Sequence, residues 1–169
     1  MAEELFTLRP AVEGDRELID RYTYVEGMDS LPSLENVTVA ANADDECVGF
    51  LRLAFSDAGV AHVNPVVVYS AWRGYGVGRA LVEDALARCG ELRLVARGKS
   101  IPFYRALGFA EATWEDIAPG VTEDCDNCDI REECGPLPMA RAKQIPSASR
   151  TPEPTGGSLP MVRAERKGE

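Results

Sequence analysis

The sequence predicts a single mixed α/β domain in which strands and helices alternate along the chain. Three valines, Val66 to Val68, predict a buried strand. A glycine-rich turn follows at residues 73–78, and beyond it the apolar residues recur at helical spacing. The length of 169 residues allows one domain with a hydrophobic core, followed by a tail.

The first part of the chain is expected to form a strand, a helix and a hairpin. Residues 5–9 predict the opening strand, and Asp15 is a suitable N-cap for a helix over residues 16–24. Residues 36–41 and 46–55 predict two strands, and the short polar segment between them favours a tight hairpin turn.

The next strand, residues 62–70, leads directly into the glycine turn. The helix after the turn is expected to end at Gly90, because glycine is common just beyond helix C-termini. Its apolar side chains form two adjacent rows, as in a helix with one face against a core. These rows are Val77, Leu81 and Ala85, and then Val82, Leu86 and Cys89.

The second half of the chain alternates in the same way. Residues 92–96 predict a strand, and residues 100–108 predict a helix with its terminating glycine. The last two strands are expected at residues 109–114 and 137–143. The segment between them, residues 116–135, is an acidic insertion that carries cysteines.

Composition sets the domain boundaries and the class of protein. Residues 1–145 are assigned to the folded domain and residues 146–169 to a flexible tail, because proline, serine and glycine dominate the tail. The formal net charge of −10 argues against nucleic-acid binding. No apolar run could cross a membrane and the acidic N-terminus does not resemble a signal peptide, so a cytoplasmic protein is expected. The sequence leaves open whether the protein forms a homodimer.

A turn with three glycines that opens a helix exposes backbone N–H groups at the positive end of the helix dipole, which suits a phosphate. Two nucleotide-binding motifs do not fit it. The phosphate loop of nucleotide hydrolases needs lysine and then serine or threonine after its last glycine, whereas Arg79 and Ala80 follow Gly78. The dinucleotide fingerprint needs a third glycine where Arg79 stands.

The pattern that remains is Arg-x-x-Gly-x-Gly, at Arg73-Gly74-Tyr75-Gly76-Val77-Gly78. It resembles the coenzyme A pyrophosphate loop of the GNAT superfamily, the Gcn5-related N-acetyltransferases. Three further segments are similar to family motifs and follow in the family's order. They are Leu8-Arg9-Pro10-Ala11 with Asp15, Val68 five residues before Arg73, and Phe103-Tyr104-Arg105-Ala106-Leu107-Gly108-Phe109.

The resemblance covers about residues 5–143 and implies a GNAT-like fold. Such a fold has a central, mostly antiparallel sheet that splays at its fourth strand, with helices on both faces. Acetyl-CoA is the implied cosubstrate, and a backbone N–H near Val68, at a bulge, is the implied oxyanion donor. The residues implied in cofactor binding are Val66, Val68, Arg73, Gly74, Tyr75, Gly76, Val77, Gly78, Arg79 and Arg97. Arg97 stands where the family often has asparagine, and is a candidate charged donor to a phosphate.

Tyr104 matches the family's tyrosine that gives a proton to the departing thiolate, so the resemblance implies that it is the general acid. The general base is not identified. Four polar residues are candidates, and water could serve in their place. These residues are His62, Asp57, Glu26 and Glu115.

The cysteines of the insertion form a Cys-x2-Cys-x5-Cys pattern at Cys125, Cys128 and Cys134. Two thiolates at this spacing can turn toward one metal ion, and zinc and an iron–sulfur cluster are both compatible with it. Reduced thiols and a redox disulfide are the alternatives. A metal would order an acidic loop between the last two strands. Candidates for a fourth ligand are Cys47, Cys89, His62 or a nearby aspartate.

We therefore expect an N-acetyltransferase that moves an acetyl group from acetyl-CoA to a primary amine by direct attack in a ternary complex. The sequence does not identify the acceptor, although an acidic chain favours a positively charged amine such as a lysine, a protein N-terminus or a polyamine. The alternative is a non-catalytic acyl-CoA-binding protein that senses redox state or metal through its cysteines. Tyr104 and the complete glycine turn favour the enzyme.

Overall fold

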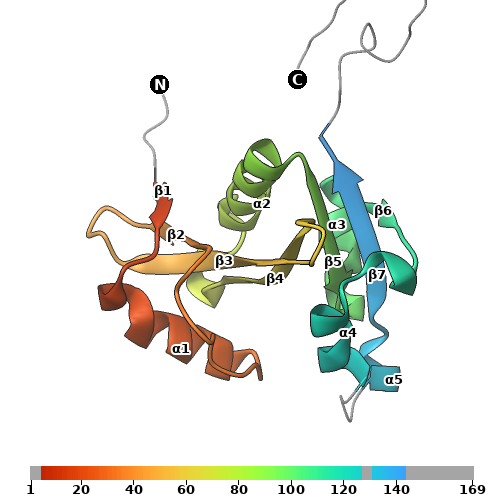
Figure 1. Cartoon of the computed structure of the whole chain (residues 1–169). Helices are drawn as coiled ribbons and strands as arrows, with labels where there is room; N and C mark the ends of the chain where they lie inside the picture. The colour runs from red at the N-terminus through yellow and green to blue at the C-terminus, as the bar shows by residue number, and fades with distance from the viewer. Residues whose placement is uncertain (1–4, 127–130, 144–169) are drawn as a thin grey trace, which may run out of the picture.

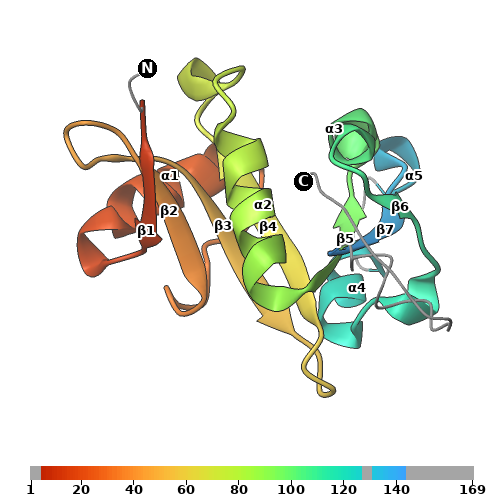
Figure 2. The same cartoon turned by 90° about the horizontal axis from the view of Figure 1, so that it is seen from above.

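The computed structural model describes residues 5–126 and 131–143 (Figure 1). The tail expected at residues 146–169 and the motif residue Cys128 lie outside this part of the chain. A central sheet has helices against both faces (Figures 1 and 2), which confirms the predicted fold class. In the described ranges, no helix combines the length and the apolar character needed to span a bilayer.

The sheet has seven strands in the order β1-β2-β3-β4-β5-β7-β6. All neighbouring strands run antiparallel except β4 and β5, which run parallel. The strands are β1 (Thr7–Pro10), β2 (Val37–Ala41), β3 (Cys47–Phe55), β4 (Ala61–Val68), β5 (Glu91–Ala96), β6 (Ala110–Glu111) and β7 (Leu137–Ala142).

The helices α1 and α2 cover opposite faces of this sheet (Figure 1). Ile19 of α1 packs in a cluster with Phe50, whereas Leu81 of α2 packs with Leu51 in the other cluster. Phe50 and Leu51 are neighbours on β3, and successive strand residues point to opposite faces. The α-helices are α1 (Arg16–Val25), α2 (Val77–Cys89), α3 (Ile101–Ala106), α4 (Pro119–Asp126) and α5 (Arg131–Cys134). Short 3-10 helices lie at Glu13–Asp15, Ser70–Trp72, Gly98–Ser100 and Trp114–Asp116.

The sheet splays between β4 and β5, as the family resemblance implied. The two strands are paired in register only at His62 and Arg93. Beyond this point the end of β4, residues 66–68, pairs with β3 and leaves its other edge open. The opening lies between the N-terminus of α2 on one side and α3 on the other (Figure 2).

A β-bulge interrupts β4 just before this open edge. Leu51 pairs with Val66 and Leu53 with Val63, so two residues of β4 stand opposite one residue of β3. The bulge is therefore at residues 64–65. The expectation of a bulge near Val68 was wrong, because Val68 pairs regularly with Gly49.

The strand expected at residues 109–114 is shorter than its sequence suggested. Only Ala110–Glu111 forms β6, and Trp114–Asp116 turns into a 3-10 helix. The Asp116 carboxylate accepts hydrogen bonds from both the backbone N–H and the hydroxyl of Thr113, each at 3.0 Å. Such local side-chain bonds compete with strand pairing.

The insertion between β6 and β7 contains the helices α4 and α5 rather than an irregular loop. Ile117 and Val121 bury their side chains at its start. The backbone N–H of Ala118 also donates to Nε2 of the buried His62 at 3.1 Å. The insertion, expected as an acidic loop that a metal would order, therefore has ordering contacts of its own within the described residues.

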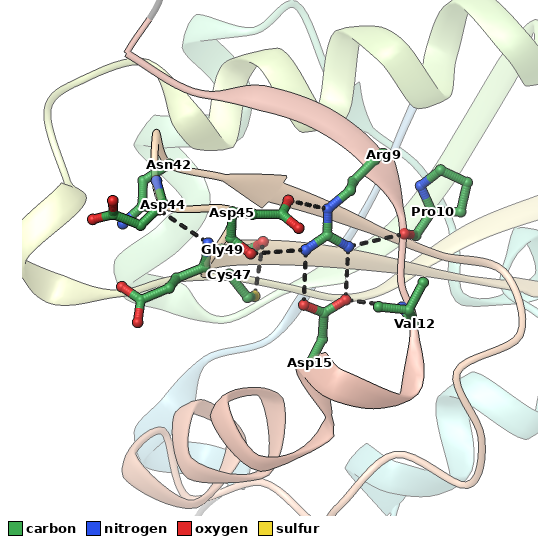
Figure 3. A network of polar contacts seen from close by, with 10 residues as sticks. Arg9, Pro10, Val12, Asp15, Asn42, Asp44, Asp45, Cys47 and Gly49 are labelled. Atoms are coloured by element: carbon green, nitrogen blue, oxygen red, sulfur yellow. Dashed lines mark hydrogen bonds and ion pairs between the residues drawn. The ribbon is translucent and has the colours of Figure 1, made fainter.

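Arg9 connects the first strand, the first helix and the β2–β3 hairpin (Figure 3). Its guanidinium contacts the two carboxylate oxygens of Asp15 at 2.8 and 3.0 Å, and its Nε contacts Asp45 at 2.9 Å. Asp15 stands at the N-cap of α1, but its carboxylate accepts from the N–H of Val12 instead of capping the helix. Burial alone would raise the pKa of Asp15, but the bonds from Arg9 and Val12 outweigh it and lower the pKa.

We expect Asp15→Asn to lower the free energy of unfolding at pH 7 by about 2 kcal/mol, because Arg9 loses a buried charge partner. A carboxyl with a lowered folded pKa stabilises the protein above the unfolded pKa of about 3.9, and that stability is lost as the pH falls through the folded pKa. Urea unfolding should therefore show a difference from wild type at pH 7 that shrinks in acid. The exposed Asp44→Asn is the control, and an equal loss in both variants would contradict the assignment.

Candidate active site

The splay between β4 and β5 contains a cavity of about 600 Å³. Residues from four regions form its walls: the end of α1, the end of β4, the glycine turn with the start of α2, and the segment from Arg97 through α3. Apolar side chains such as Val66, Trp72 and Leu107 line it beside charged ones. A mixed wall of this kind suits a ligand with an apolar stem and anionic groups.

The glycine turn presents the N-terminus of α2 to this cavity. Gly74 and Gly76 have φ angles of 89° and 84°, a left-handed conformation that favours glycine. Gly76 is the N-cap of α2 and makes no side-chain cap. The first turn of a helix has N–H groups without intrahelical partners, so this end is chemically suited to an anion.

Gly78 has a packing role that the sequence did not reveal. A Cβ on Gly78 would lie 3.0 Å from Cζ of Phe103 and 3.6 Å from a methyl group of Val68. The missing side chain therefore lets α2 approach α3 and β4 closely across the cavity.

Four cationic side chains line the cavity, and they are Arg73, Arg79, Arg97 and Lys99. The sequence predicted the three arginines and missed Lys99. Glu26 is the acidic residue on the wall of this cavity, and its carboxylate contacts Arg73 at 2.8 Å. The carbonyl of Glu26 also accepts a hydrogen bond from Arg97 at 3.2 Å.

Tyr104 lies on α3 with its side chain buried, and it lines the same cavity. Phe103 and Phe109 hold its ring through edge contacts at centroid distances of 5.0 and 5.5 Å. Burial raises the pKa of the Tyr104 phenol above its usual range, so the hydroxyl remains protonated at neutral pH.

The structure brings nearly all of the predicted cofactor residues together on this cavity. Tyr75 is the exception, because its side chain is exposed and packs against Trp72 at a ring distance of 5.6 Å. Sequence reasoning also missed Trp72 and Phe103 on the wall. Their aromatic character was visible in the sequence, but nothing in the spacing indicated which way they face.

Of the candidate general bases, only Glu26 lies on the wall of this cavity. His62 is a buried residue of β4, where its Nδ1 contacts the carbonyl of Val60 and its Nε2 accepts from the N–H of Ala118. Both ring nitrogens are thus used by the backbone, which makes His62 a structural residue. Asp57 and Glu115 do not contribute to the wall.

The predicted metal site lies only partly within the described residues. Among those residues, no group of three or more potential ligands gathers. Cys134 ends α5, and its carbonyl meets the position that a Cβ on Gly98 would occupy, beside the cavity wall. Cys47 is not a suitable fourth ligand, because it is buried beneath α1 and burial raises the pKa of its thiol to about 12. His62 is excluded by its two backbone contacts.

A model of the Acetyltransferase (GNAT) family matches residues 2–109. The chain belongs to this family. An uncharacterized N-acetyltransferase of Chlorobaculum tepidum is 27% identical to this acetyltransferase over 146 residues, which is 79% of this chain and 94% of the relative. The match confirms the enzyme class that the motifs predicted, an N-acetyltransferase.

Solved structures show the same GNAT fold. Ard1 from Thermoplasma volcanium superimposes with a TM-score of 0.65 at 20% identity, covering 84% of this chain and 100% of that one. Rv2747 from Mycobacterium tuberculosis, solved with CoA and NLQ, has a TM-score of 0.66 at 19% identity and covers 82% and 99%. N-acetylglutamate synthase from Neisseria gonorrhoeae, solved with coenzyme A and N-acetyl-glutamate, has a TM-score of 0.67 at 15% identity. This match covers 83% of the present chain but only 36% of the synthase.

We expect Gly76→Ala to lower the free energy of unfolding by about 1 kcal/mol, because alanine is strained at a φ of 84°. Gly14→Ala is the matched control, since its Cβ would meet open space and its φ is not left-handed. Urea denaturation of both variants measures the difference. Equal stability of the two would show that the turn relaxes without cost.

Proposed function

We propose that this acetyltransferase moves an acetyl group from acetyl-CoA to a primary amine by direct attack in a ternary complex. One observation carries the proposal: a single cavity joins the anion-binding end of α2, the open edge of β4 and the buried hydroxyl-bearing side chain of Tyr104. Structures with the same fold contain coenzyme A, which agrees with the donor.

The residues on the cavity fit coenzyme A chemically. The N–H groups at the start of α2 would hold the pyrophosphate, with Arg73 and Arg79 beside them. Arg97 and Lys99 supply further charge for phosphate oxygens on the opposite wall. The apolar end of β4, residues 66–68, would contact the pantetheine arm through its open edge.

The proposed reaction forms a C–N bond and breaks the thioester C–S bond. The neutral amine attacks the carbonyl carbon, and the oxyanion receives a hydrogen bond from a backbone N–H on the open edge near Val68. The thiolate leaves and takes the proton of the Tyr104 hydroxyl. The nitrogen loses its extra proton to water, and the tyrosine is reprotonated from solvent.

The acceptor is proposed to be a positively charged amine in solution. The chain carries a formal net charge of −10, and a carboxylate, Glu26, stands on the cavity wall. A lysine, a protein N-terminus and a polyamine all satisfy this chemistry. Neither the family match nor the fold supports the alternative of a non-catalytic sensor.

We expect Tyr104→Phe to lower kcat by about 10²-fold while the Kd for acetyl-CoA stays near the wild-type value. The ring contacts with Phe103 and Phe109 remain, and only the proton donor is removed. Release of free thiol measures turnover, and calorimetry measures binding. Tyr24→Phe, at a tyrosine that is 83% exposed, is the control. Wild-type turnover in Tyr104→Phe would exclude the general-acid role.

We also propose that Cys125, Cys128 and Cys134 bind a metal, either zinc or the iron of an iron–sulfur cluster. The spacing of the three thiols supports this proposal. Elemental analysis of purified, untagged protein should find near-stoichiometric zinc or iron. Cys134→Ser should lose that metal, whereas Cys47→Ala should keep it, because Cys47 lies in the core beneath α1. Absence of both metals from the wild-type protein would end the proposal.

A further inference from the structure

Glu26 stands at a place where its own helix does not favour a negative charge. It is the C-cap of α1, where the helix dipole is negative, and the last turn of α1 has no basic residue. The negative charge of Glu26 is instead balanced by Arg73, a residue distant in sequence, through a 2.8 Å contact. A residue that breaks a local rule in this way often has a functional reason.

The backbone around Glu26 is held firmly. Gly27 adopts a left-handed φ of 74° and donates its N–H to Tyr24, and Met28 donates to Thr23 at 2.8 Å. The Glu26 side chain is only 19% exposed, whereas that of Arg73 is 57% exposed. Of the two partners, Arg73 is therefore the one with freedom to move.

Arg73 is also the partner with two competing demands. It belongs to the loop that presents backbone N–H groups to an anion, and its Nε contacts the carbonyl of Val68 at 3.3 Å. A phosphate in the cavity would be a stronger ligand for a guanidinium than a single carboxylate contact, because it offers more oxygens and more charge.

We propose that Glu26 is a displaceable counter-ion for Arg73, so that donor binding exchanges a carboxylate for a phosphate on the guanidinium. In the free enzyme the Glu26 carboxylate holds Arg73. When the cofactor's phosphate takes Arg73, the Glu26 carboxylate is released on the wall of the cavity. Glu26 is thus a positioning residue whose contact is broken when the donor binds. This inference rests on the proposed use of coenzyme A.

The test is the Kd for coenzyme A of Glu26→Gln, measured by calorimetry without acceptor. Glutamine keeps an oxygen for Arg73 but removes the charge that competes with phosphate. The variant should bind coenzyme A about threefold more tightly, the size expected for a partly exposed ion pair. Glu35→Gln, an exposed change of equal charge before β2, should leave the Kd unchanged.

A double-mutant cycle distinguishes the proposed exchange on Arg73 from simple charge repulsion between Glu26 and the phosphate. Arg73→Gln should weaken binding, and adding Glu26→Gln to it should give no further gain, because there is no ion pair left to break. If Glu26→Gln tightens binding equally in both backgrounds, or does not tighten it in wild type, the proposal is overturned. For variants that bind too weakly for calorimetry, the rise in Tm caused by millimolar coenzyme A can be compared instead. A wild-type protein that binds no coenzyme A would instead refute the proposed function.

Discussion

The site depends on the separation of β4 from β5 after a single paired position. In a continuous sheet the open edge of β4 would be satisfied by its neighbour, and no space would remain between the two helices beyond it. Here the strands part after His62 and Arg93, and the edge at residues 66–68 faces a cavity. Backbone groups that a neighbouring strand would have used are thereby left for a ligand. The N-terminus of α2 and Tyr104 of α3 both line that cavity.

The separation is held at a fixed width by contacts on both sides of it. On one face, Gly78 lets α2 lie directly against the ring of Phe103, and a Cβ at this point would require that ring to shift. On the other side, His62 ties the insertion to the sheet at the last position where β4 and β5 are paired. The bulge in β4 lies between these two points and shifts the register of the strand before its open end. The gap is therefore built into the packing rather than left by an unfilled core.

The sequence predicted those features that depend on local chemistry. The glycine turn and the end of α2 before the left-handed Gly90 followed from spacing and from glycine's conformational freedom, whereas α2 begins at Val77, inside the turn expected at residues 73–78. Lys99 and the length of β6 could not be predicted in this way. Lys99 lines the cavity from the segment that follows β5, and Asp116 bonds back to Thr113 just beyond the end of β6. Both outcomes depend on contacts that no periodicity in the sequence records.

The cavity is lined mainly by positive charges, whereas the whole chain is negative. The two are compatible because salt screens the more distant charges. A net charge of −10 acts on an approaching anion at long range, but physiological salt screens exposed charges beyond about 8 Å. Within the cavity the local charges dominate, and four cations stand there with one carboxylate. The carboxylate of Glu26 lowers the attraction of the cavity for phosphate. We therefore expect it to have a use that outweighs this cost. The ion pair with Arg73 at 2.8 Å supplies one, because in our proposal this carboxylate occupies the guanidinium in the free enzyme and a phosphate replaces it when the donor binds.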